Sequence, residues 1–173
     1  MSYRNIYASL FVFIGLISSN ISVLSENQHS SQNKAVLIES TRFNITTIKT
    51  FINNSEFLIK SGNFDEAIEN LKKARTLSNL LISYYRDING SFRGIDTLIS
   101  LEMSKKNKYV IQLLAQANMQ LASIYRSKGE FELAVPLLVD VVKRLTPLKP
   151  KGMKAYQQLF ELGFVETPYL GDS

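Results

Sequence analysis

The sequence predicts an all-α fold, and three observations support that prediction. From residue 35 onward, apolar side chains recur three and four residues apart, which is the spacing of one face of an amphipathic helix. Runs that alternate apolar and polar residues are few, so the strand signal is weak. Breaks rich in Gly, Pro, Ser or Asn fall at four places. They divide the chain into five expected helices, at about residues 36–60, 64–88, 95–127, 131–145 and 151–162.

The first two expected helices are separated by the turn at residues 61–63, which contains a glycine. The apolar stripe of the first helix consists of Phe51, Ile52, Phe57, Leu58 and Ile59. The stripe of the second helix consists of Ala67, Ile68, Leu71, Ala74, Leu77 and Leu81. We expect the second helix to end before residues 89–91, because Asn and Gly are frequent where helices end.

The third expected helix is long, and a break near Ser104 to Asn107 is the alternative to one continuous helix. The fourth helix ends before the segment from Pro147 to Gly152, which contains two prolines. The fifth is short and amphipathic, and its apolar face is expected to cover the preceding hairpin; the residues are Tyr156, Leu159, Phe160 and Leu162.

Residues 1–25 have the pattern of an export or anchoring segment. Arg4 precedes an uncharged apolar run, Ile6 to Ile17, of the length found in signal peptides and short of the roughly 20 residues that span a bilayer. Cleavage after residue 25 would make this segment a signal peptide. The alternative is an uncleaved anchor, because residues 6–24 are 19 uncharged residues in a row.

We therefore expect the protein to be exported, to a periplasm, a thylakoid lumen or the cell exterior, or to associate with a membrane through residues 6–24. Residues 26–34 are polar and read as a linker. The helical domain is expected at 35–162. A tail at 163–173 follows, and its apolar side chains either fold back onto the last helix, which we favour, or form a short docking motif; these are Phe164, Tyr169 and Leu170.

The composition excludes several kinds of chemistry. The chain has no Cys and one His, which excludes disulfides and zinc–thiolate sites and leaves His without catalytic partners. We therefore predict no catalytic residue, no metal site and no cofactor. The net charge of +5 is spread thinly, with small clusters at residues 105–108 and 143–154. Neither cluster has the repeated aromatic residues of a surface that binds single-stranded nucleic acid, so no nucleic-acid partner is expected.

Two of the breaks between helices lie in matching sequence contexts. In both, a glycine is followed two residues later by Phe, then by a small Ala and by a large aliphatic residue. The earlier copy has Gly62, Phe64, Ala67, Leu71 and Ala74. The later copy has Ala122, Tyr125, Gly129, Phe131, Ala134 and Leu138. The glycines are 67 residues apart, close to two periods of about 34 residues.

This pattern resembles the tetratricopeptide repeat (TPR), a helix–turn–helix unit of about 34 residues. The resemblance implies a TPR-like array of helical hairpins, a short right-handed α-solenoid, with recognisable repeats at 48–81 and 115–148. Residues 82–114 have the length of one repeat and lack its residues, so they form a degenerate repeat or a pair of elongated helices. The last helix, at 151–162, would cap the array. The small, aromatic and large aliphatic residues of both copies would form the repeat core.

The resemblance also implies a concave groove lined by the first helix of each repeat. When the groove positions of the repeat motif are transferred to this sequence, the residues expected to line the groove are Lys49, Ile52, Glu56, Ile59, Lys60, Gln116, Met119, Gln120, Ser123 and Arg126. The set departs from the chaperone-binding repeats, which clamp a C-terminal carboxylate with Lys, Asn and Arg, because Glu56 stands where that clamp has Asn. Its mixed polar and aliphatic character favours a protein partner over a small molecule.

The function expected from these residues is non-enzymatic protein binding, as an adaptor or assembly factor that is exported or tethered to a membrane. The leader followed by a short repeat array is similar in layout to the small membrane-anchored TPR proteins of cyanobacteria and plastids that assist photosystem assembly. A self-associating structural subunit is a further alternative. A hydrolytic enzyme on a helical scaffold is disfavoured, because the acidic residues fall mostly in turns and at helix starts.

Overall fold

The described part of the chain is all-α. A computed structural model describes residues 43–171, which belong to one compact unit, Ser40–Ser173. These residues form five helices and no strand, which confirms the predicted class: α2 (Ile45–Lys60), α3 (Phe64–Phe92), α4 (Thr97–Ser127), α5 (Phe131–Leu145) and α6 (Pro150–Glu161). The expected leader at 1–25, the linker at 26–34 and the first residues of the helical domain lie outside the described residues.

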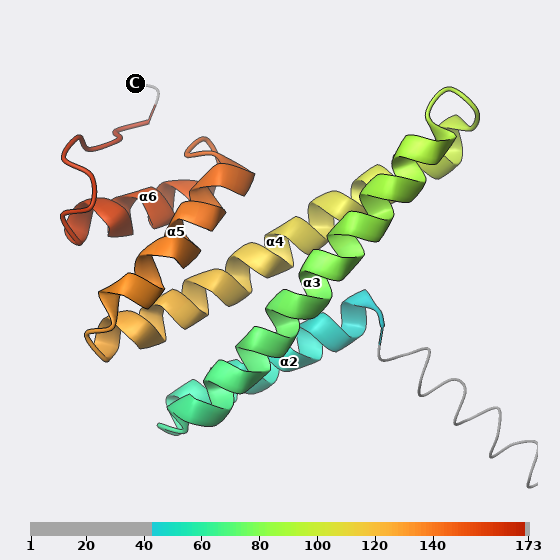
Figure 1. Cartoon of the computed structure of the whole chain (residues 1–173). Coiled ribbons are helices and arrows are strands. Elements are labelled where there is room, and N and C mark those ends of the chain that lie inside the picture. Colours follow the sequence, from blue (N-terminus) through green and yellow to red (C-terminus); the bar gives the residue numbers. More distant parts are fainter. Residues whose placement is uncertain (1–42, 172–173) are drawn as a thin grey trace, which may run out of the picture. The chain divides into compact units, whose positions relative to one another are not determined.

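Each helix packs mainly against the next one along the chain, as expected of an array of helical hairpins. The most extensive contact joins α3 to α4, which form a long antiparallel hairpin (Figure 1). α2 packs against α3 and also touches α4, while α5 packs against α4 and α6 against α5. None of the described helices combines the length and apolar character needed to cross a membrane.

Polar side chains fix where two of the helices begin. The Asn44 side chain accepts a hydrogen bond from the Thr47 backbone N–H at 3.0 Å, so it caps the start of α2. The Asp96 side chain accepts from the backbone N–H groups of Leu98 and Ile99, at 2.8 and 3.0 Å, and caps α4 in the same way. These caps satisfy backbone donors that have no partner inside the helix.

Three predicted helix limits differ from the structure. α2 begins at Ile45, well after residue 36, because Asn44 has an extended backbone and acts as the cap. α3 continues to Phe92, past the predicted end at 88, because Gly90 is accommodated within the helix. α4 is continuous, so the break near Ser104 to Asn107 does not occur. That segment contains neither Gly nor Pro, and an ion pair one helical turn apart, from Glu102 to Lys106 at 2.6 Å, spans it.

Most residues predicted for the repeat core lie inside the domain. The aliphatic members are fully buried between neighbouring helices: Ala67, Leu71, Ala74, Ala122, Ala134 and Leu138. Tyr125 packs partly buried against them. Small side chains at these positions allow close approach of the helices, and larger neighbours fill the remaining space.

The other predicted core residues lie nearer the surface. Gly62 and Gly129 have positive φ angles of 79° and 76° and end α2 and α4, a conformation that glycine adopts at low cost. Phe64 and Phe131 directly follow these turns and are not buried; Phe131 is 50% exposed. The expectation that both aromatic rings fill the core is therefore wrong, because each is the first residue of its helix and extends past the packed layer.

The tail lies on α6. The Tyr156 hydroxyl donates a hydrogen bond to the Thr167 carbonyl at 2.8 Å, and the rings of Tyr156 and Tyr169 meet edge to face with centroids 6.2 Å apart. The backbone N–H of Phe164 donates to the Leu159 carbonyl at 2.9 Å. Tyr169 therefore folds back onto α6, whereas Phe164 and Leu170 are 57% and 89% exposed, so the expectation that the apolar side chains of the tail cover α6 holds only for Tyr169.

Candidate functional site

An open groove runs between α2 and α4, the first helices of the two predicted hairpins. Its volume is about 440 Å³. Side chains from both helices and from the start of α3 line it: Glu56, Ile59, Lys60, Phe64, Gln120, Ser123, Ile124 and Ser127. The groove therefore lies where the repeat resemblance places a binding surface.

Glu56 joins the two helices across the groove. Its Oε1 atom accepts hydrogen bonds from Gln120 Nε2 at 2.8 Å and from Gln116 Nε2 at 3.2 Å. Two neutral donors therefore hold one oxygen of the carboxylate in place. This arrangement fixes the relative position of α2 and α4, and it leaves a negatively charged group at the groove surface.

The floor of the groove is apolar and its edges are polar. Ile59 and Ile124 are largely buried, and the partly exposed ring of Phe64 lies beside them. Lys60, Ser123 and Ser127 are exposed at the edges. A ligand can therefore bury apolar side chains on the floor while its polar groups form hydrogen bonds at the edges.

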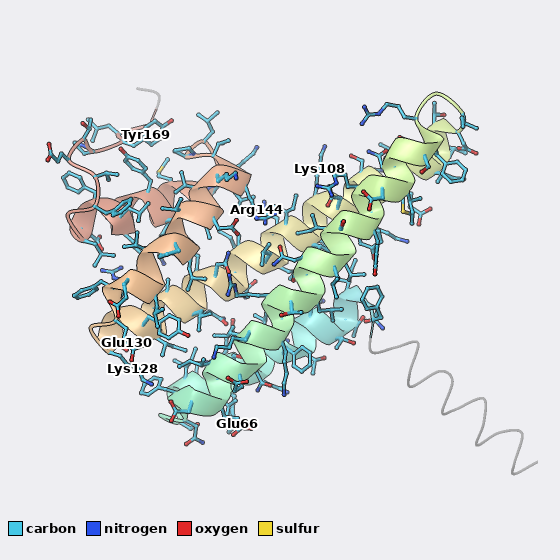
Figure 2. The ribbon with its side chains drawn as sticks, viewed as in Figure 1. Glu66, Lys108, Lys128, Glu130, Arg144 and Tyr169 are labelled. Carbon is cyan, nitrogen blue, oxygen red and sulfur yellow. The ribbon has the colours of Figure 1, made fainter. Side chains whose placement is uncertain are left out.

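An ion pair between α3 and the residue after α4 lies next to the groove. Lys128 Nζ lies 3.0 Å from Asp65 Oδ1, and these residues adjoin the groove residues Ser127 and Phe64 in sequence. The hydrogen bond to Asp65 raises the pKa of Lys128 above its ordinary value of 10.5. The lysine is therefore charged at neutral pH. It links the end of α4 to the start of α3; Figure 2 labels Lys128.

Half of the residues predicted for the groove lie in it. Glu56, Ile59, Lys60, Gln120 and Ser123 line the cavity. Gln116 does not line it but donates a hydrogen bond to Glu56.

The remaining predicted groove residues lie elsewhere. Ile52 is 1% exposed and belongs to the core, so its assignment to the groove is wrong. Met119 packs partly buried against the core. Arg126 forms an ion pair with Glu161 of α6 at 3.1 Å, and Lys49 is exposed outside the lining. Transferring groove positions from the repeat motif fails here, because the motif predicts the helix on which a residue lies. It does not predict which face of that helix the neighbouring helices bury in this protein.

Sequence reasoning missed three residues that line the groove, namely Phe64, Ile124 and Ser127. Phe64 and Ser127 lie beside the two glycine turns. Their position at these turns is a sequence signal that could have placed them at the groove. Residues at the ends of adjacent helices come together when the helices are joined by short turns.

A second polar cluster, also missed from the sequence, joins α3, α4 and α5. Asn118 is fully buried; its Oδ1 accepts from Arg75 Nε at 2.6 Å and its Nδ2 donates to Asp140 Oδ2 at 2.9 Å. Arg144 in turn donates to Asp140 at 2.9 Å and to Asn79 Oδ1 at 3.3 Å. The cluster satisfies a buried amide, and its role is to fix how three helices pack.

Among the residues that the structure describes, no group of His, Asp or Glu is arranged to hold a metal ion. The groove brings together one carboxylate, one lysine and two serines, without a histidine.

Residues 115–144 match the family model of the tetratricopeptide repeat. This match supports a tetratricopeptide repeat in that one segment, which consists of the last part of α4 and nearly all of α5. The repeat predicted at 48–81 lies outside the match and stays a prediction, and the match does not test whether residues 82–114 form a degenerate repeat. Comparisons with curated proteins and with solved structures found no significant match.

Proposed function

We infer that the groove between α2 and α4 binds a segment of a partner protein. The observation that carries this proposal is the apolar floor of the groove between the first helices of two hairpins, where Ile59 and Phe64 are partly exposed to solvent and Ile124 is buried beneath them. The tetratricopeptide repeat is a protein–protein interaction module, and α4 belongs to the matched repeat. The floor and the family therefore support the same function.

The chemistry of the groove restricts the segment that it accepts. A volume of about 440 Å³ lies within the range of roughly 300–1,000 Å³ that is usual for ligand sites, and it suits a few side chains. Glu56 gives the centre a negative charge, while Lys60 places a positive charge at one edge. We propose a segment with aliphatic or aromatic anchors and with both donors and acceptors, and not a strongly acidic one.

The wider role that we propose is that of a non-enzymatic adaptor or assembly factor. The apolar run at residues 6–24 supports a form that is exported or tethered to a membrane. A tethered repeat domain would hold its partner near the membrane surface. This part of the proposal rests on the sequence pattern and on the layout shared with membrane-anchored repeat proteins.

Site-specific crosslinking in the native host tests the groove. A photoreactive amino acid at Ser123, which is exposed at the groove edge, should crosslink to a partner protein. The matched control is the same amino acid at Asn54, an exposed residue of α2 outside the groove. We expect a crosslinked partner from position 123 and none from position 54.

The captured protein is then purified, and its affinity is measured for the wild-type full chain and for its Ser123→Arg and Asn54→Arg variants. Ser123→Arg should weaken binding by at least tenfold, because the long side chain occupies the groove, whereas Asn54→Arg should leave it unchanged. Both changes are on the surface and should preserve the circular dichroism spectrum. Equal affinity of the Ser123→Arg and wild-type proteins would overturn the assignment of the groove.

A further inference from the structure

The far end of the α3–α4 hairpin has a surface that the groove does not use. Between residues 83 and 109 no side chain is buried, although Ile82 and Val110 on either side belong to the core. We call residues 83–109 the hairpin end. Figure 1 shows its connecting loop projecting away from α2, α5 and α6. The hairpin end therefore adds little to the core, and its exposed side chains are its distinctive feature.

Three aliphatic side chains are exposed at the tip. Ile95 in the connecting loop is 79% exposed, and Leu98 and Leu101 in the first turns of α4 are 76% and 51% exposed. Single exposed aliphatic residues are common on proteins, but a cluster of them at one extremity marks an interaction site. The Asp96 cap, which binds the backbone of Leu98, fixes the first turn on which two of them lie.

The leucines share one face of α4 with two lysines. An α-helix turns by about 100° per residue, so Leu98, Leu101, Lys105 and Lys108 fall within about 80° of one another around the axis. This face is opposite the one that becomes buried from Val110 onward. The solvent face of α4 therefore carries apolar side chains at the tip and cations behind them; Figure 2 labels Lys108 on α4.

The cations on this surface are available to a ligand. Arg93, Lys105 and Lys108 make no ion pair with any residue that the structure describes. The acidic residues of the hairpin end are already engaged: Asp87 pairs with Arg86, Glu102 pairs with Lys106, and Asp96 caps α4. With five Lys and Arg against three Asp and Glu, the hairpin end has a net positive charge.

We propose that the hairpin end binds an anionic lipid surface. Ile95, Leu98 and Leu101 enter the boundary between headgroups and acyl chains, while Arg93, Lys105 and Lys108 bind lipid phosphates. With the hairpin end entering the bilayer end-on, Lys105 lies about 6 Å and Lys108 about 10.5 Å behind Leu101 along the axis of α4, at about 1.5 Å per residue. Apolar faces of interfacial helices lie about 5–10 Å deep, so this spacing brings the lysines to headgroup level.

The order of the side chains favours a lipid surface over a protein partner. A bilayer presents apolar chains beneath a layer of phosphates, and the hairpin end presents aliphatic side chains in front of cations. Lysine stems can also lie along the apolar region while their charges remain in water. This site is separate from the α2–α4 groove, so the hairpin end can bind lipid whether or not the groove is occupied.

Tryptophan fluorescence tests the proposal, because the chain contains no Trp. The Ile95→Trp variant of the full chain is mixed with vesicles of phosphatidylglycerol and phosphatidylcholine. We expect its emission to shift to shorter wavelength and to be quenched by brominated lipids. With vesicles of phosphatidylcholine alone, and at raised salt, the shift should be much smaller, since salt screens the attraction between lysines and phosphates.

Phe57→Trp is the matched control. Phe57 is exposed on α2, near the turn that starts α3 and therefore at the other end of α3 from the tip. Any vesicle binding by residues 6–24 is common to both variants, so only the response at position 95 reports on the tip. Absence of a shift at position 95, or equal quenching at both positions, overturns the proposal. A shift that grows with protein concentration without vesicles assigns the tip to a second copy of the chain and also overturns it.

The charge requirement is tested in the Ile95→Trp background. Changing Lys105 and Lys108 together to Ser should weaken binding to the anionic vesicles by about 30-fold, on the scale of about fivefold for each cation near an anionic surface. Both lysines are exposed, so the fold should be unaffected. Unchanged affinity in this variant would show that the lysines do not bind the phosphates, which overturns the anionic specificity.

Discussion

A side chain on Gly152 would collide with the carbonyl oxygen of Thr146, because an ideal Cβ at Gly152 lies only 1.8 Å from that oxygen. Gly152 is buried in the first turn of α6, and Thr146 ends α5 with a positive φ of 57°. The chain therefore reverses so tightly between α5 and α6 that a hydrogen is the only substituent that fits at position 152.

Gly152→Ala should destabilise the domain. The neighbouring atoms are backbone atoms and cannot rotate away, so α6 must shift, at a cost of about 1–3 kcal/mol or more. Urea denaturation followed by circular dichroism measures the change in the free energy of unfolding.

Gly90→Ala is the control for this change. Gly90 lies within α3 with no neighbouring atom near its would-be Cβ, so the alanine should stabilise the helix by about 0.5–1 kcal/mol. Opposite signs for the two substitutions are expected. A neutral or stabilising effect of Gly152→Ala would show that α6 does not pack against Thr146 as described.

The buried amide of Asn118 should be energetically coupled to Asp140. Asn118→Ala removes the hydrogen bonds of Asn118 with Asp140 and Arg75 and leaves Asp140 paired only with Arg144, which should lower the free energy of unfolding by about 1–3 kcal/mol. In a double-mutant cycle with Asp140→Ala, the coupling energy should be roughly 0.5–3 kcal/mol. Urea denaturation of the four proteins measures it.

The exposed pair Glu69–Lys72 provides the comparison. Its atoms are 3.1 Å apart, similar to the distance in the buried contact, but both side chains are more than half exposed. A cycle on this pair should give a much smaller coupling energy, because water competes for both groups. Equal coupling energies in the two cycles would mean that burial of Asn118 does not strengthen its interaction with Asp140.

Much of the fold was predictable because the apolar spacing and the glycine turns are local signals. The glycine turns at Gly62 and Gly129 predicted where the helices on either side of them end and begin. The site was less predictable, because Ile52 and Ile59 are both apolar residues of α2, and only the packing of α3 and α4 decides that the first is buried and the second lines the groove. The hydrogen bonds of Asn118 join it to residues at least 22 positions away in the sequence, for which no local pattern exists.

The pKa of Lys128 should fall when Asp65 is neutralised. The hydrogen bond to Asp65 is the main cause that raises it, so Asp65→Asn should return the pKa toward 10.5. NMR titration of the lysine side-chain signals measures the change. Lys72, whose pKa is raised by its hydrogen bond to Glu69, should titrate as in the wild type.

The sign of the corresponding pH dependence follows from this shift. Because the pKa of Lys128 is higher in the folded than in the unfolded chain, its small contribution to stability is complete below 10.5 and is lost as the pH rises through the folded value. The difference in melting temperature between wild type and Lys128→Met should therefore shrink above that pH. A difference that grows with pH would mean that the pair with Asp65 does not form.

Substitutions at Ile52 and Ile59 should separate the core from the groove. Ile52 is fully enclosed, so Ile52→Ala should lower the free energy of unfolding by about 2–5 kcal/mol. Ile59 is partly exposed in the groove, and Ile59→Ala should cost less because the groove is already open to water. The effects on affinity for the crosslinked partner should be the reverse of those on stability. Ile59→Ala should weaken binding, whereas the folded fraction of Ile52→Ala should bind the partner as the wild type does. Loss of binding by folded Ile52→Ala, with full binding by Ile59→Ala, would place the partner on another face of α2.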